Sequence, residues 1–131
     1  MKIEGTTNSA NNTVQRKALM VDEDKDRYRR KERTDSLKQA GFKVYPVLRM
    51  QDVSARCKPG AFDVIVINGM QNPGPALELG EQIKTNDPRQ RLFVVSSQSY
   101  EGENRDYIVS SWEELTRRIA AEDQPKDLVA A

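Results

Sequence analysis

The stretch Phe62-Asp63-Val64-Ile65-Val66-Ile67-Asn68 decides the fold of this chain, because it is the most apolar run and ends on a polar residue. A continuous run of β-branched side chains, preceded by the turn residues Pro59-Gly60, indicates a strand that is buried on both faces. Strands of this kind lie at the centre of parallel sheets. We therefore expect residues 61–67 to form the central strand of an α/β domain.

Strand-like and helix-like segments alternate on both sides of this run. Alternation at this spacing indicates βαβ units with right-handed crossovers. We expect a flavodoxin-like, three-layer α/β/α sandwich whose five parallel strands have the order 2-1-3-4-5. Pro46 interrupts the second strand and places it at an edge. The expected strands are 17–21, 42–47, 61–67, 92–96 and 106–109, and the expected helices are 25–40, 51–58, 76–85 and 111–121.

The length of 131 residues suits one domain. Residues 1–15 are rich in Asn, Thr and Ser and offer little to bury, so we expect a disordered N-terminal segment. The folded domain should cover residues 16–122. Residues 123–131 should form a disordered tail.

The composition excludes several classes of function. A formal net charge of +1 gives no bulk attraction to nucleic acid or to an anionic membrane. No apolar run approaches the length of a membrane span. The single cysteine, Cys57, excludes an internal disulfide and fits a cytoplasmic protein, and its thiol should be inert. The absence of histidine removes histidine-based acid–base catalysis and most zinc sites.

Polar residues follow the expected strands where their carboxyl ends meet. Asp22 and Glu23 close the first strand, Asn68 closes the third, and Ser96 closes the fourth. In a parallel α/β sheet this edge, next to the switch between strands one and three, is where ligands and metals bind. We expect these four side chains to gather there.

Five segments in order resemble the receiver domain of bacterial two-component response regulators, a CheY-like family. They are the first strand with its acidic residues, the helix-to-strand turn, the strand before Asn68, the strand that ends in Ser96, and the last strand. These segments are residues 19–24, 39–44, 62–67, 94–96 and 107–109.

The resemblance implies a phosphorylation site that lacks its reactive groups. In the family, an acidic pair and an aspartate hold Mg²⁺, and the aspartate accepts phosphate while a hydroxyl and a lysine contact it. Asp22 and Glu23 match the acidic pair, and Ser96 matches the hydroxyl. Asn68 stands at the phosphoacceptor position and Ser110 at the lysine position. An amide lacks the nucleophilic oxygen of a carboxylate, so we expect no phosphotransfer.

The metal site should be weak for the same reason. Asp22 and Glu23 are the only ligands that the resemblance supplies for a divalent cation, and two carboxylates without a third hold Mg²⁺ poorly. We therefore expect no cofactor. Because one carboxylate and one ammonium are lost together, we expect the pocket to keep the family's formal charge and to stay folded without metal.

A second departure from the family concerns the surface for partners. Too few residues separate Ser96 from the last strand for a full helix with two loops, so the fourth helix should be shortened or missing. Its loss would bare apolar surface over the fourth and fifth strands. Tyr100, Tyr107 and Trp112 are the aromatic side chains that we expect to cover this surface or to contact a partner there.

We therefore predict a degenerate receiver domain, which has lost the groups for phosphotransfer and is not an enzyme. It would act as a phosphorylation-independent protein-interaction module in bacterial two-component-type signalling, with another protein or a second copy as partner. One alternative is an active regulator that binds a divalent cation and is phosphorylated at an unconventional residue such as Ser96. A weaker alternative is a nucleic-acid-binding module that uses the arginine-rich segment 27–33.

The pair Asn68-Gly69 raises one further hypothesis. Glycine after asparagine lets the backbone nitrogen attack the side-chain amide, and the resulting deamidation would regenerate an acidic residue at position 68. A rigid strand end would prevent this reaction.

Overall fold

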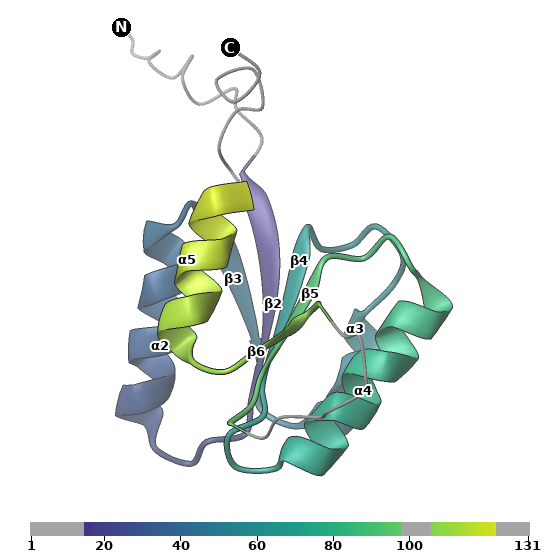
Figure 1. Ribbon diagram of the computed structural model, residues 1–131, viewed down its shortest axis with the longest axis horizontal. Helices are drawn as coiled ribbons and strands as arrows, with labels where there is room; N and C mark the ends of the chain where they lie inside the picture. Colours follow the sequence, from purple (N-terminus) through teal and green to yellow (C-terminus); the bar gives the residue numbers. More distant parts are fainter. Residues whose placement is uncertain (1–14, 98–105, 123–131) are drawn as a thin grey trace, which may run out of the picture.

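The computed structural model describes residues 15–97 and 106–122. In this part of the chain, strands and helices alternate as the sequence predicts (Figure 1). The elements are β2 (Arg16–Asp22), α2 (Arg27–Gln39), β3 (Phe42–Val47), the 3₁₀ turn η2 (Met50–Asp52), α3 (Val53–Arg56), β4 (Val64–Asn68), α4 (Pro73–Asn86), β5 (Leu92–Val95), β6 (Ile108–Val109) and α5 (Trp112–Glu122).

The five strands form one parallel sheet in the order β3-β2-β4-β5-β6. Numbered along the chain, this order is 2-1-3-4-5, so the predicted flavodoxin-like topology is confirmed. The strand that carries Pro46, β3, lies at an edge as expected. In β4 every residue is buried, which explains its unbroken run of β-branched side chains.

Helices cover both faces of the sheet, so the core has two halves (Figure 1). Helices α2 and α5 pack on one face, where Leu37 and Leu115 meet Met20 of β2. Helices α3 and α4 pack on the other face, where Val53 and Ile83 join the core. The predicted three-layer α/β/α arrangement is therefore confirmed.

The predicted boundaries need local corrections. Strand β4 begins at Val64, three residues later than expected, and extends to Asn68. Helix α4 begins at Pro73, so the segment predicted to be a turn before the helix is its first turn; a proline is well tolerated there because its missing N–H would have no partner. The helix expected over 51–58 is only the short pair η2 and α3, which ends before Cys57.

Several expectations concern residues outside the described part of the chain. The shortened or missing fourth helix falls mainly on residues 98–105, and Tyr100 lies there too. The ends that we expect to be disordered, 1–15 and 123–131, also lie outside the described residues, apart from Gln15. Among the described residues, no helix is long and apolar enough to span a membrane.

Candidate functional site at the carboxyl edge of the sheet

Asp22 and Asn68 lie side by side at the carboxyl edge, because β2 and β4 are neighbouring strands and these two residues are paired in their register. The amide nitrogen of Asn68 donates a hydrogen bond to Asp22 Oδ1 at 3.0 Å. The amide oxygen of Asn68 accepts from the backbone N–H of Met70 at 3.2 Å. A carboxylate only accepts and a backbone N–H only donates, so these two neighbours fix the orientation of the amide.

Both side chains are removed from water. Asp22 is 3% exposed and Asn68 is 2% exposed. A buried carboxylate needs a partner that compensates its charge, and an amide alone supplies none. The compensating charge comes from helix α2.

Two arginines of α2 close over the carboxylates. Arg33 donates from Nε to Asp22 Oδ2 at 2.7 Å and from Nη2 to Asp24 Oδ2 at 2.8 Å, bridging the two acids. Arg29 donates from Nε to Asp24 Oδ2 at 2.9 Å and from Nη2 to Asp24 Oδ1 at 3.2 Å. We call Asp22, Asp24, Arg29, Arg33 and Asn68 the carboxyl-edge cluster.

The local sequence builds this cluster through tight turns. The Asp24 N–H donates to Asp22 Oδ1 at 3.1 Å, and the Asp26 N–H donates to Asp24 Oδ1 at 2.9 Å. Asp26 then caps α2 by accepting from the first backbone N–H groups of the helix. Residues four apart share one face of a helix and lean toward its N-terminus, so Arg29 and Arg33 both point back at the acids.

The electrostatics of this cluster favour the ionised form of Asp24. The two hydrogen bonds from Arg29, together with the backbone N–H of Asp26 and the guanidinium of Arg33, hold the pKa of Asp24 well below its ordinary value of 3.8. Arg33 is itself largely buried, with a side chain that is 17% exposed. The arginine-rich segment 27–33 therefore contributes one of its arginines to the interior.

Glu23 does not join the cluster. Its Oε2 accepts from the backbone N–H of Met50 at 2.8 Å, and its Oε1 accepts from Asn72 Nδ2 at 3.0 Å. It ties the start of η2 to the residue before α4. Asp22 and Asp24 share the guanidinium of Arg33, whereas Glu23, the second member of the predicted acidic pair, binds elsewhere.

These residues do not fit a bound Mg²⁺. The ion requires oxygen ligands directed at a common point. Both oxygens of Asp22 accept hydrogen bonds from Arg33 and Asn68, both oxygens of Glu23 accept from other donors, and the amide of Asn68 turns its nitrogen toward Asp22. Among the described residues, no group of three or more His, Cys, Asp or Glu side chains is arranged to hold a metal.

The two predicted switch serines lie in different settings. Ser96 is buried, and its backbone N–H donates to the Val109 carbonyl, joining β5 to β6. Ser110 donates its N–H and its hydroxyl to Glu114 Oε1 at 2.7 and 2.8 Å. Ser111 Oγ accepts from the N–H of Glu114 at 3.1 Å and caps α5. Ser110 therefore serves the start of α5 instead of reaching toward the cluster as a lysine would.

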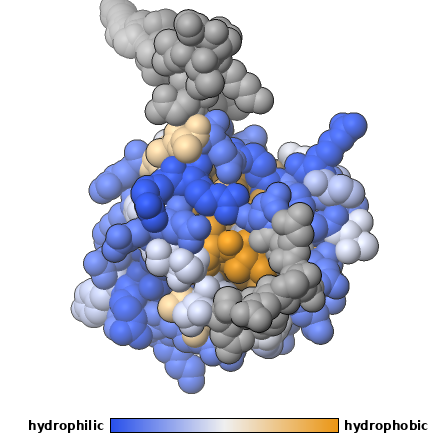
Figure 2. All heavy atoms as spheres, in the orientation of Figure 1, coloured by the Kyte–Doolittle hydropathy of each residue, from blue (hydrophilic) through white to orange (hydrophobic). Residues whose placement is uncertain are grey.

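The surface over β5 and β6 carries an apolar patch between α4 and α5 (Figure 2). Ile108 of β6 is half-buried there. Tyr107 packs toward α4, since a Cβ at Gly80 would stand 3.3 Å from its ring. Trp112 is half-buried against the α2–α5 side of the core, and its Nε1 is the one buried side-chain nitrogen or oxygen in the described chain without a hydrogen-bond partner.

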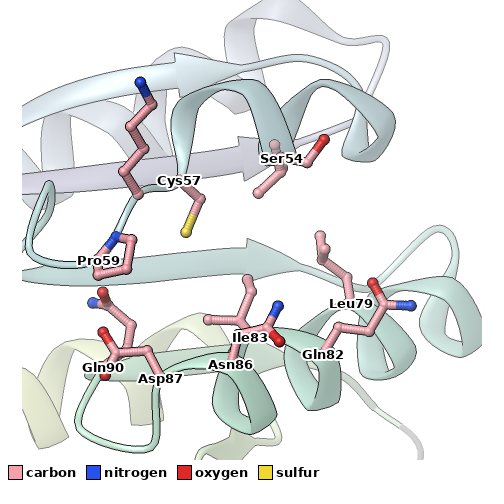
Figure 3. A pocket seen from close by; sticks show the side chains of 11 residues that line it. Ser54, Cys57, Pro59, Leu79, Gln82, Ile83, Asn86, Asp87 and Gln90 are labelled. Atoms are coloured by element: carbon pink, nitrogen blue, oxygen red, sulfur yellow. The ribbon is translucent and has the colours of Figure 1, made fainter.

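A separate cavity of about 220 Å³ lies between α3 and α4 (Figure 3). The Cys57 thiol points into it, toward α4. Burial raises the pKa of this thiol, and the carboxylate of Asp87 raises it further. A thiol that stays protonated is a poor nucleophile, which supports the prediction that Cys57 is inert.

Sequence reasoning missed the arginines and the role of Asp24. The signal was present, since an acidic cluster is followed at helical spacing by Arg29 and Arg33. A charged helix segment is usually exposed to solvent, so the sequence alone gives no reason to place these arginines in the interior. Their contacts follow from the short distance in sequence between the end of β2 at Asp22 and the helix cap at Asp26.

Comparison with solved structures supports the fold independently. The receiver domain of DrrB, activated with BeF₃, is 22% identical, with a TM-score of 0.63 over 82% of this chain and 97% of the other. The non-phosphorylated HemR receiver domain from Leptospira biflexa is 16% identical, with a TM-score of 0.65 over 85% and 98%. A complex of histidine kinase ThkA with response regulator TrrA matches at 15% identity, with a TM-score of 0.63 over 83% and 99%.

The chain has the fold of CheY-like response regulator receiver domains. No family model matches the sequence, and no curated protein matches it.

Proposed function

We propose that this domain is a phosphorylation-independent, receiver-like interaction module that performs no phosphotransfer. The observation that carries the proposal is the carboxyl-edge cluster. Asn68 directs an amide N–H at Asp22 where the family presents a carboxylate, and Arg33 bridges Asp22 and Asp24 at 2.7 and 2.8 Å. Donors internal to the chain thus occupy the acidic oxygens that would bind a metal.

The state of such a module is set by partner binding and not by phosphate, because a ligand shifts a conformational equilibrium only through differential affinity for its states. The complex of ThkA with TrrA shows that a protein of this fold binds another protein. In this chain, the apolar patch over β5 and β6 (Figure 2) is the surface that we assign to a protein partner. Ile108 belongs to β6 and is half-buried.

The alternative of an active regulator has less support. Ser96 is buried, so a phosphodonor has little access to its hydroxyl. The chain has no histidine that could act as its base, and the cluster's carboxylates already accept charged hydrogen bonds. Two of the arginines on which the nucleic-acid alternative relies, Arg29 and Arg33, bind Asp22 and Asp24 instead.

Incubation with acetyl phosphate and Mg²⁺, followed by intact-mass analysis, tests the loss of phosphotransfer. We expect no phosphorylated adduct on this chain, while a receiver with an intact acidic site, treated in parallel, gains one phosphoryl group. An adduct on this chain, mapped to Ser96 or to any other described residue, would overturn the proposal.

Capture from a lysate tests the assigned surface. Ile108→Lys should abolish capture of a partner that the unchanged chain retains, whereas Tyr28→Ala, on an exposed ring of α2, should leave capture intact. Circular dichroism establishes that both variants are folded. Equal capture by the two variants would remove the β5–β6 surface from the proposal.

A further inference from the structure

A second surface, distinct from the patch over β5 and β6, lies between α2 and the edge strand β3. A groove of about 330 Å³ runs there, and we call it the α2–β3 groove. Helix α2 forms one wall and the end of β3 forms the other. The residues on which the argument rests are Arg27, Arg30, Lys38, Pro46, Val47 and Leu48.

The charges that face this groove are not balanced. Its lining includes two carboxylates, and each is already paired: Asp22 with Arg33 at 2.7 Å, and Asp35 with Lys31 at 2.7 Å. Arg27, Arg30 and Lys38 also line the groove, and within the described chain none of the three forms an ion pair with a carboxylate. Arg30 also donates to the backbone carbonyl of Asp24, but that oxygen carries no formal charge, so the charges of all three cations remain available to an external anion.

The floor beside these cations is apolar. Leu48 directly follows β3 and is 55% exposed, although large apolar side chains in this domain are otherwise mostly buried. Val47, which is buried, and Pro46, which is exposed, also line the groove. Leu48 also lines an adjoining hollow of mixed charge, where Lys25 and Arg49 lie near Asp22, Glu23 and Asp24, and where Arg49 is paired with Asp52 at 3.0 Å.

We infer that the α2–β3 groove binds an extended acidic segment of a protein partner, with one apolar side chain on Leu48 and carboxylates near Arg27, Arg30 and Lys38. Charge complementarity selects the acidic residues, and the exposed leucine selects an apolar one between them. Nucleic acid fits less well because its backbone offers nothing apolar for Leu48. This inference rests on the proposed function only in taking the partner to be a protein.

The expected affinity is modest and depends on salt. Exposed ion pairs each contribute little and are screened by added salt, so the binding energy is shared between several pairs and one apolar contact. Binding of this kind suits a reversible signalling contact. It also predicts that charge reversal and loss of the leucine each weaken binding.

Fluorescence anisotropy of the full chain with a labelled peptide that alternates Glu and Leu tests the inference. Control probes are the same peptide with Ala for Leu, the same peptide with Lys for Glu, and a single-stranded oligonucleotide. The Glu-Leu peptide should bind saturably, and the control probes more weakly. Combined Arg27→Glu and Lys38→Glu should raise its Kd by about tenfold or more.

Lys58→Glu combined with Arg89→Glu is the matched control, because these exposed cations lie on other parts of the surface and the net charge changes equally. Leu48→Ser should weaken binding without changing its salt dependence.

Amide shifts on addition of the peptide should locate it along α2 and the end of β3. The inference would be overturned if the Glu-Leu peptide did not bind, or if both double variants weakened its binding equally. It would also be overturned if the amide shifts lay on another part of the surface, or if the chain preferred the oligonucleotide. These outcomes leave the acetyl phosphate and capture results untouched, so either proposal can fail alone.

Discussion

At the scale of single residues, the carboxyl-edge cluster is held together by hydrogen bonds internal to the chain. An amide at position 68 presents a donor to Asp22, and a guanidinium spans Asp22 and Asp24. A planar guanidinium has several donors in a fixed geometry, which suits two carboxylates at once. The edge is therefore satisfied without any ligand.

Removal of Arg33 should be costly. Arg33→Met keeps most of the side chain's apolar length but leaves Asp22 and Asp24 with less compensating charge, and we expect the free energy of unfolding to fall by about 3 kcal/mol. Lys31→Met is the matched control on the same helix, since it breaks only the exposed pair with Asp35 and should cost less than about 1 kcal/mol. Urea denaturation measures both. Equal losses would show that Arg33 forms an ordinary surface pair.

Stability should fall in acid, in part because of Asp24. Its pKa is lowered in the folded chain, first by Arg29, so its contribution is complete above its ordinary pKa of 3.8 and is lost as the pH drops below that value. Asp24→Asn should reduce this loss, whereas Asp106→Asn, at an exposed carboxylate, should not. Urea unfolding at a series of pH values provides the comparison, and an unchanged acid dependence in Asp24→Asn would contradict the cluster.

Asn68 should resist deamidation in the folded chain. The reaction needs the Gly69 nitrogen to attack the Asn68 side chain, but the Gly69 N–H donates to the Val95 carbonyl at 2.7 Å, and the amide is bonded to Asp22 and Met70. Peptide mapping after prolonged incubation should find Asn68 intact in buffer and converted in urea. Conversion at equal rates would mean that this strand end opens readily.

Sequence predicted the place of Asn68 better than its surroundings. Strand pairing alone puts residues 22 and 68 at one edge, because parallel strands beside each other end together. The expected pocket charge omitted Arg33, whose position depends on a side chain reaching across from another element. The sequence pattern predicts where a residue lies along its strand. Which side chains of other elements contact that residue can be seen only in the packed structure.

At the scale of elements, α4 contains two glycines with opposite requirements. A Cβ at Gly80 would stand 2.9 Å from Val94 Cγ2 on β5, whereas a Cβ at Gly74 would meet nothing within 4 Å. Gly80→Ala should therefore lower the free energy of unfolding by about 1–3 kcal/mol, since it overpacks a stiff buried contact. Gly74→Ala should raise it by about 0.5 kcal/mol through helix propensity. Thermal unfolding of both variants tests this, and a stabilising Gly80→Ala would show that α4 and β5 are more loosely packed.

The sequence predicted which segments form strands and helices, but it did not predict the residues at which they begin and end. Unbroken apolar runs identified β2, β4 and β5, because these strands are buried along nearly their whole length, and the longer segments between strands indicated the helices. The first turn of α4 was missed because Asn72-Pro73-Gly74-Pro75 has the composition of a turn, yet proline is compatible with the start of a helix. Helix α2 buries only Leu37 fully, so arginine contacts, and not an apolar stripe, attach its first half to the domain.

At the scale of the whole molecule, three arginines in the first half of α2 contact oxygens of the segment that follows β2 or ends it. Arg29 and Arg33 bind the acids of the cluster, and Arg30 donates to the backbone carbonyl of Asp24. With a net charge of +1, we expect no retention of the chain on single- or double-stranded DNA at physiological salt. Retention that falls with salt and is lost in combined Arg29→Ala and Arg30→Ala would restore the nucleic-acid alternative.

The central claim is that the carboxyl edge is complete without metal or phosphate, and titration with Mg²⁺ followed by amide NMR tests it most directly. In the unchanged chain, the amides of residues 22–24 and 68–70 should show no saturable shift in millimolar Mg²⁺, because the oxygens of Asp22 already accept from Arg33 and Asn68. A saturable shift confined to those amides would contradict the account.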